Sequence, residues 1–67
     1  MKIRIRHLGG EIRELDARVV GTKVLVRWPM YPDLVFVLAT GKGAGPASTW
    51  TIPKEELERL RRAHASA

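Results

Sequence analysis

Residues 2–6 read Lys-Ile-Arg-Ile-Arg, a strict alternation of basic and β-branched apolar residues. Side chains alternate across a β-strand, so Ile3 and Ile5 would point to one face and the basic residues to the other. A second alternation, Lys-Val-Leu-Val-Arg-Trp at residues 23–28, predicts another strand that could lie beside the first. One face of this pair would build a core, and the other would carry a basic row formed by Lys2, Arg4, Arg6, Lys23 and Arg27.

Five short strands and a terminal helix are expected along the chain. The strands would cover about residues 2–7, 11–20, 23–28, 34–39 and 48–52, and the helix about residues 53–64. Leu57 and Leu60 would form the narrow apolar stripe with which the helix closes the sheet. The sequence therefore predicts a single, mostly β domain over residues 1–67, a small SH3-like (chromo-like) barrel with a C-terminal helix.

Two segments depart from simple alternation. Ile12 and Leu15 are out of phase within residues 11–20, which predicts a bulge or a sharp bend near Arg13 and Glu14. Residues 34–38, Leu-Val-Phe-Val-Leu, are apolar on both faces, so a monomer would leave one set of these side chains in water. We therefore expect a homodimer through residues 34–38. The alternative is a monomer whose terminal helix covers this strand.

Composition limits the functional classes. The 67-residue chain has 12 Lys and Arg against 7 Asp and Glu, a net charge of +5, which favours an anionic partner. Without cysteine there is no disulfide or thiolate zinc site, and His7 and His64 lie far apart, so we expect no metal and no cofactor. No nucleophile is paired with a base, so no enzyme is expected. No membrane span or signal peptide is recognisable, and a cytoplasmic protein is predicted.

Nucleic-acid binding is the first functional hypothesis. The basic row would hold the phosphates of duplex DNA or of RNA, and Lys42 would add a further contact. Lys42 lies in the glycine-rich residues 40–46, which we expect to be a flexible, featureless loop. This loop lacks the Lys-Ser/Thr ending and the following helix of a nucleotide-binding loop. The plainer interpretation is that the basic row is a solvated sheet face.

A protein-interaction module is the alternative, for example a small phage or mobile-element factor that docks on a host protein. Its contacts would be Trp28, Met30 and Tyr31, which lie in or beside the proline-framed residues 29–33. Trp28 is also a candidate for the core, as is Trp50, because so small a core needs large side chains. The distribution of charge separates the two hypotheses, since basic residues scattered among carboxylates would count against nucleic-acid binding.

Two stretches near the ends of the chain match a known pattern. Residues 2–6, with Gly10-Glu11 and Glu14-Leu15-Asp16 after them, look like the opening hairpin of the small, seven-kilodalton basic chromatin proteins of crenarchaea. Gly41-Lys42 and residues 53–57 are similar to their closing loop and helix. This resemblance implies a small barrel that binds DNA. The segment in which those proteins carry an exposed tryptophan is largely missing between Asp16 and Gly21.

The middle of the chain matches a second pattern. Residues 16–21 leading to residues 24–31 look like the central hairpin of chromodomains, and Thr49-Trp50 is similar to their ending before the helix. The resemblance implies an aromatic cage for methylated lysine, with Trp28 and Tyr31 as two of its walls. The third wall would fall at Gly9, which offers no ring.

Overall fold

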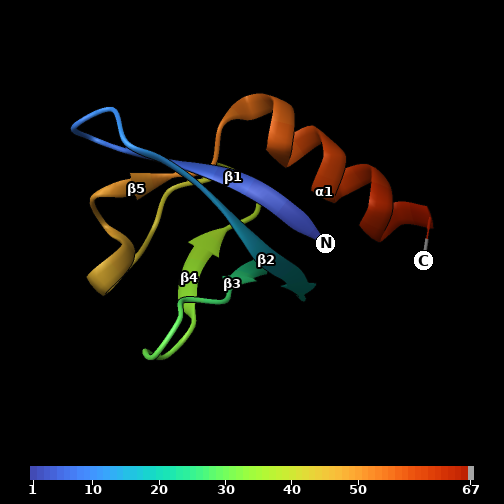
Figure 1. The fold of residues 1–67 in the computed structure, drawn as a ribbon. Helices are drawn as coiled ribbons and strands as arrows, with labels where there is room; N and C mark the ends of the chain where they lie inside the picture. The colour runs from blue at the N-terminus through green and yellow to red at the C-terminus, as the bar shows by residue number, and fades with distance from the viewer. Residues whose placement is uncertain (67) are drawn as a thin grey trace.

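The computed structural model describes residues 1–66, which form five antiparallel strands and one α-helix (Figure 1). The elements are β1 (Lys2–His7), β2 (Ile12–Val20), β3 (Lys23–Val26), β4 (Leu34–Val37), the short 3-10 helix η1 (Gly45–Ala47), β5 (Trp50–Thr51) and α1 (Lys54–Ser66). The strand order is β4-β3-β2-β1-β5. The predicted mostly β fold with a C-terminal helix is confirmed, and β3, β4 and β5 are shorter than predicted. No helix within residues 1–66 has the length and apolar character needed to cross a membrane.

β2 is the long central strand, and its two halves pair with different neighbours. Its first half pairs with β1 in an unbroken register from Lys2 opposite Asp16 to Arg6 opposite Ile12, and its second half pairs with β3. The bulge predicted within this strand is therefore wrong. Ile12 is out of phase with Leu15 because it lies on the outer face, where 58% of its surface is exposed.

Residues 40–46 close the barrel, although we expected a flexible, featureless loop. The N–H of Val37 donates to the carbonyl of Lys42 on one side, at 3.0 Å. On the other side, the N–H of Ile52 donates to the carbonyl of Gly41, at 2.9 Å. A Cβ atom at Gly41 would lie 2.6 Å from the Ile52 carbonyl oxygen, so this position needs glycine. The segment thus links β4 to β5, and the sheet becomes a nearly closed barrel.

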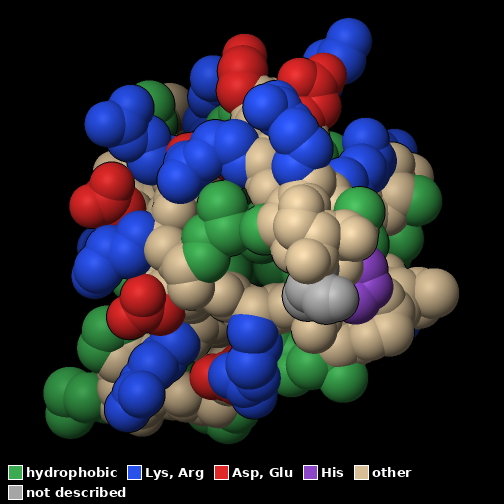
Figure 2. All heavy atoms as spheres, turned by 90° about the vertical axis from the view of Figure 1, so that its right-hand side faces the viewer, with side chains coloured by type: hydrophobic (Ala, Val, Ile, Leu, Met, Phe, Trp, Pro, Cys, Tyr) green, Lys and Arg blue, Asp and Glu red, His purple; other side chains and the backbone are tan. Residues whose placement is uncertain are grey.

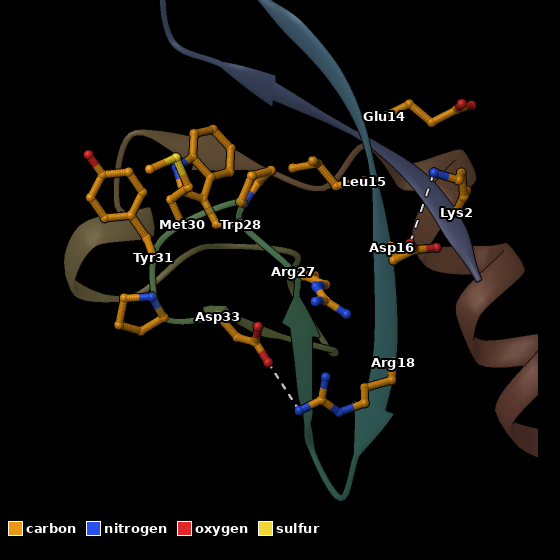
Figure 3. A pocket seen from close by; sticks show the side chains of 12 residues that line it. Lys2, Glu14, Leu15, Asp16, Arg18, Arg27, Trp28, Met30, Tyr31 and Asp33 are labelled. Carbon is orange, nitrogen blue, oxygen red and sulfur yellow. Dashed lines mark ion pairs between the residues drawn. The ribbon is translucent and has the colours of Figure 1, made fainter.

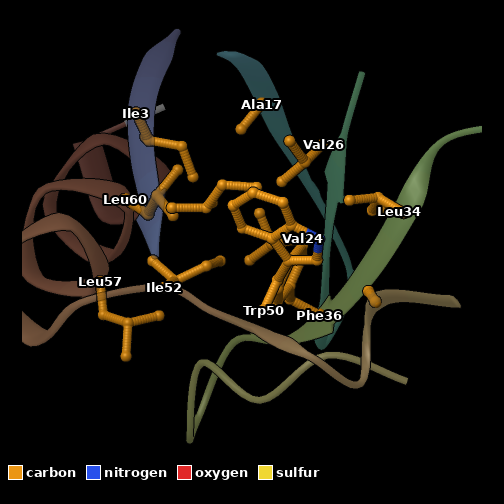
Figure 4. Packing of buried hydrophobic residues seen from close by; sticks show 12 residues of the cluster. Ile3, Ala17, Val24, Val26, Leu34, Phe36, Trp50, Ile52, Leu57 and Leu60 are labelled. Carbon is orange, nitrogen blue, oxygen red and sulfur yellow. The ribbon is translucent and has the colours of Figure 1, made fainter. Parts of the chain in front are cut away.

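The interior of the barrel is apolar (Figure 4). Its buried residues are Ile3, Ile5, Ala17, Val24, Val26, Leu34, Phe36, Ala47, Trp50, Ile52, Leu57 and Leu60. As predicted, Leu57 and Leu60 of α1 enter this cluster, beside Ile52 and Ile3 respectively. Burial of each large side chain contributes about 1.5–3 kcal/mol, which makes this cluster the main source of stability.

A buried carboxylate ties α1 to β1. Glu56 is only 8% exposed, and it accepts a hydrogen bond from the N–H of Arg4 at 2.9 Å. The same carboxylate pairs with the guanidinium of Arg59, which also donates to the carbonyl of Lys2 at 3.4 Å. β5 pairs only with the last two residues of β1, and the backbone of Lys2 and Arg4 is hydrogen-bonded to α1 instead.

β4 has apolar residues on both faces, as predicted. Leu34 and Phe36 lie in the core, whereas Val35 and Val37 are half-buried on the outer side. The outer edge of β4 is hydrogen-bonded to residues 40–46 and is not open for pairing with a second copy. The homodimer stays a prediction, and it would have to use the outer side of Val35 and Val37.

Candidate functional site

The predicted basic row is divided between separate parts of the barrel. β2 lies between β1 and β3, so the bases of β1 are not neighbours of those on and after β3. Acidic residues of β2 stand in the space between them. Lys2 is opposite Asp16, with 4.0 Å between the amino nitrogen and the carboxylate, and Arg4 is opposite Glu14. The charges that we expected to form one patch are thus mixed with carboxylates.

Other surfaces show the same mixing. Glu55 and Glu56 of α1 line one shallow hollow together with the basic side chains of β1. On the face where both termini lie, acidic side chains stand among the basic ones (Figure 2). On these surfaces the basic side chains are interrupted by acidic ones and do not form one continuous patch.

Two predicted phosphate contacts do lie close together. Thr51 is directly opposite Arg6 of β1 and also directly opposite Lys42 of the closing segment. Two cross-strand steps place the Cβ atoms of Arg6 and Lys42 about 10 Å apart. Neither residue takes part in an ion pair with any residue from 1 to 66. Arg6 and Lys42 thus form a short basic row. The other predicted phosphate contacts that form no ion pair within residues 1–66 are Arg4, Lys23 and Arg27.

Residues 28–33 form the tight turn and loop between β3 and β4. The N–H of Tyr31 donates to the carbonyl of Trp28 at 3.2 Å, which leaves Pro29 and Met30 at the two central positions of the turn. Met30 has a φ of 67°, the left-handed conformation that a type II turn normally gives to glycine. A side chain there costs about 1–2 kcal/mol. Met30 is nevertheless 98% exposed, and the neighbouring Tyr31 is 69% exposed.

Two hollows flank this loop. The β2 cleft, of about 820 Å³, lies between the loop and β2 (Figure 3) and is lined by Lys2, Glu14, Leu15, Asp16, Arg18, Arg27 and residues 28–33. The β4 groove, of about 300 Å³, is lined by Trp28, residues 31–35, Ala44 and Pro46. The loop therefore has a hollow on each side, and both are within or near the size range of ligand sites, roughly 300–1,000 Å³.

Contacts with neighbouring rings and with Arg13 hold Trp28 in place as a wall of both hollows. Its ring lies 5.5 Å from that of Trp50, which in turn lies 4.8 Å from the ring of His7. The guanidinium of Arg13 lies 5.0 Å from the centroid of the Trp28 ring. Trp50 belongs to the buried core, whereas Trp28 is half-buried and partly faces solvent. The indole is thus a preorganised apolar surface.

An ion pair joins the two walls of the β2 cleft at one end. The guanidinium of Arg18 on β2 lies 3.0 Å from the carboxylate of Asp33 at the end of the loop (Figure 3). Leu15 extends from β2 toward Trp28 near the other end. Sequence reasoning identified Trp28, Met30 and Tyr31 as contacts but did not place Leu15 and Arg18 beside them. Their role depends on where β3 separates from β2, which no local pattern indicates.

Comparison of the chain with protein-family models, curated proteins and solved structures finds no match. The SH3-like designation and both family resemblances therefore stay predictions. Of the three cage positions implied by the chromodomain resemblance, Trp28 and Tyr31 line both hollows. Gly9 lies in the turn between β1 and β2, where its N–H donates a hydrogen bond to Nδ1 of His7 at 3.1 Å. Within residues 1–66, no three His, Cys, Asp or Glu side chains are grouped so that they could hold a metal ion.

Proposed function

We propose that this protein is an interaction module that docks on a partner protein through residues 28–33. The observation that carries the proposal is Met30, a methionine that is 98% exposed in a backbone conformation suited to glycine. The exposed Met30 side chain adds nothing to the core, and the left-handed backbone conformation of Met30 lowers the stability of the fold. Residues retained in such conformations are concentrated at functional sites.

The surroundings of Met30 support this proposal. Tyr31 and Trp28 add the aromatic surface that is enriched at the centres of protein interfaces. The β2 cleft and the β4 groove offer concave surface for side chains of a partner on both sides of the loop. Because the chain lacks cysteine, we propose the cytoplasm as the compartment in which this module works.

Selection from a phage-displayed library of random peptides tests the proposal. We expect peptides that bind the wild-type protein and bind the double variant Met30→Ala/Tyr31→Ala at least about tenfold more weakly. Leu8→Ala is the matched control, because Leu8 is 79% exposed but lies in the turn between β1 and β2. Failure to enrich any peptide, or enrichment of peptides that bind the double variant equally well, would overturn the proposal.

Nucleic-acid binding is a second candidate. It is favoured by the net charge of +5 and by Arg6 and Lys42, which flank Thr51 without carboxylate partners among residues 1–66. The partner would be duplex DNA, held through its phosphates with little dependence on sequence. A gel shift with generic duplex DNA at low and at moderate salt concentration tests this candidate. No shift at low salt would remove it.

A further inference from the structure

One edge of β2 is open where it borders the β2 cleft. β3 pairs with β2 only along Ala17–Val20, and the N–H of Arg27 adds a last hydrogen bond to the carbonyl of Asp16 at 2.8 Å. Residues 12–15 have β1 on one edge and no strand from residues 1–66 on the other. We call the exposed edge along residues 12–15 the free edge of β2.

The backbone groups of Ile12 and Glu14 face the free edge. Met1 and Ala17 exchange both of their backbone hydrogen bonds, at 2.7 and 3.0 Å, so odd-numbered residues of β2 bond to β1. In an antiparallel ladder the residues between them direct their N–H and C=O groups to the opposite side, as the carbonyl of Asp16 does. Ile12 and Glu14 are both exposed, so these backbone groups are open to an incoming strand.

The β2 cleft lies where a further strand would stand. β3 ends at Val26, and residues 28–33 then lie apart from β2 across the cleft (Figure 3). Leu15 and Trp28 present apolar surface in this space, from β2 and from the loop respectively. An extended segment placed there would have a hydrogen-bonding edge on one side and apolar side chains on the other.

β1 shows which side chains β2 accepts on a neighbouring strand. It places Arg4 opposite Glu14 on the outer face, and it places the buried Ile3 opposite Leu15 on the inner face. The side chains of β2 are shared by its two edges, so a strand at the free edge meets Glu14 on the outer face and both Leu15 and Arg13 on the inner face. β1 places the buried Ile5 opposite Arg13, so an aliphatic side chain is accepted at that position as well. Glu14 forms no ion pair with any residue from 1 to 66, so its carboxylate is available to a second basic neighbour.

We propose that an extended segment of a partner protein, with alternating basic and aliphatic residues, adds as a strand to the free edge of β2. Its backbone pairs with Ile12 and Glu14, a basic side chain stands opposite Glu14, and its aliphatic side chains pack on Leu15 and Trp28. Main-chain hydrogen bonds supply affinity in this mode, and alternate side-chain positions supply specificity. The inference rests on the proposed function, because residues 28–33 form the opposite wall of the same cleft.

A peptide copy of β1 is the probe for this mode. The synthetic peptide Lys-Ile-Arg-Ile-Arg-His, blocked at both ends, is titrated into the isotope-labelled full-length protein and followed by NMR. We expect amide exchange at Ile12 and Glu14 to slow at least about tenfold at saturation, because these amides become hydrogen-bonded. The scrambled peptide Lys-Arg-Arg-Ile-Ile-His has the same charge without the alternation, and we expect it to bind at least about tenfold more weakly.

Two variants test whether the carboxylate of Glu14 contributes to binding. Glu14→Lys should weaken binding of the probe at least about tenfold, and Glu14→Gln should weaken it less, because only the first adds repulsion. Glu58→Lys is the matched control, since Glu58 is an exposed carboxylate of α1 that lines neither the β2 cleft nor the hollow beside Ile12 and Glu14. The inference is overturned if the probe does not bind, if it binds without slowing exchange at Ile12 and Glu14, or if the scrambled peptide binds equally well.

The outcome separates this inference from the proposed function. Library peptides that depend on Met30 and Tyr31, combined with unchanged exchange at Ile12 and Glu14, would leave docking through residues 28–33 intact and remove strand addition. If no library peptide depends on Met30 and Tyr31, and exchange at Ile12 and Glu14 is also unchanged, both proposals are removed.

Discussion

The outer face of β1 and the loop of residues 28–33 are both exposed, but they differ in what surrounds their side chains. On β1, Lys2 and Arg4 stand opposite carboxylates of β2, so the fold itself supplies partners for these charges. In the loop, Met30 is 98% exposed and Tyr31 is 69% exposed. A conspicuous basic pattern in the sequence can thus be balanced within the fold, while a short loop keeps its apolar side chains exposed.

The largest expected effect is a loss of stability when the hydrogen bond between α1 and β1 is removed. Glu56→Ala removes the buried acceptor of the Arg4 N–H and leaves Arg59 without its carboxylate. We expect the free energy of unfolding to fall by about 2 kcal/mol, because a buried donor loses its partner. Denaturation in urea measures the loss. Glu55→Ala, at an exposed neighbouring carboxylate, should change stability by about 0.5 kcal/mol or less, and an equal loss in both variants would show that Glu56 has no special role.

A substitution in the loop of residues 28–33 should instead raise the stability of the fold. Met30→Gly relieves about 1–2 kcal/mol of backbone strain and adds about 0.5–1 kcal/mol of chain entropy to be lost on folding. We therefore expect the variant to be more stable by about 0.5–1 kcal/mol and to bind library-selected peptides more weakly. Met30→Ala keeps the strained backbone, so it should lose binding without the gain in stability. A Met30→Gly variant that keeps full binding would contradict a role for this side chain.

The salt dependence of DNA binding distinguishes a base that faces a carboxylate across the sheet, such as Arg4, from one that does not, such as Arg6. If DNA binds, Arg6→Ala/Lys42→Ala should lower the log–log salt slope by about 2, since each phosphate contact contributes about 0.9. The sequence alone predicts that replacing Arg4, Arg6 and Arg27 together lowers it by about 2–3. Because Arg4 stands opposite Glu14, we expect a single Arg4→Ala change to alter the slope less than Arg6→Ala does. An equal effect of the two would show that Glu14 does not compensate Arg4.

The smallest effect is expected for self-association. Only the outer side of Val35 and Val37 is left for the predicted homodimer, and these side chains are already half-buried. We therefore expect any dimer to be weak and to appear only as protein concentration rises. Sedimentation over a range of concentrations measures it, and Val37→Lys should abolish it. A mass near 7.5 kDa at every concentration would end the dimer hypothesis.

Much of the fold was readable from local patterns. The alternation in residues 2–6 correctly indicated that Ile3 and Ile5 face the core, and Leu57 and Leu60 were correctly assigned to the closing stripe of the helix. These properties depend on residues that are near one another in the chain, where the geometry of a strand or helix determines which side chains share a face.

The misinterpretations concern relations between distant segments. The phase of Ile12 indicates a bulge because an exposed isoleucine and a displaced core position look alike in sequence. The composition of residues 40–46 indicates a loop because it does not reveal that Gly41 must pass close to Ile52. The open edge of β2 follows from the point at which β3 separates from it, and a pattern of side chains carries no information about that point.

The sequence by itself determined the order of strands and helix and which faces of β1 and α1 enter the core, because side-chain periodicity is a local property of the backbone. The tertiary structure decided that β2 lies between β1 and β3, and this order placed Glu14 and Asp16 among the bases. It also decided that Met30 and Tyr31 stand beside an open strand edge. Strand order and edge exposure depend on contacts between residues far apart in the chain, whose free energy no single segment contains.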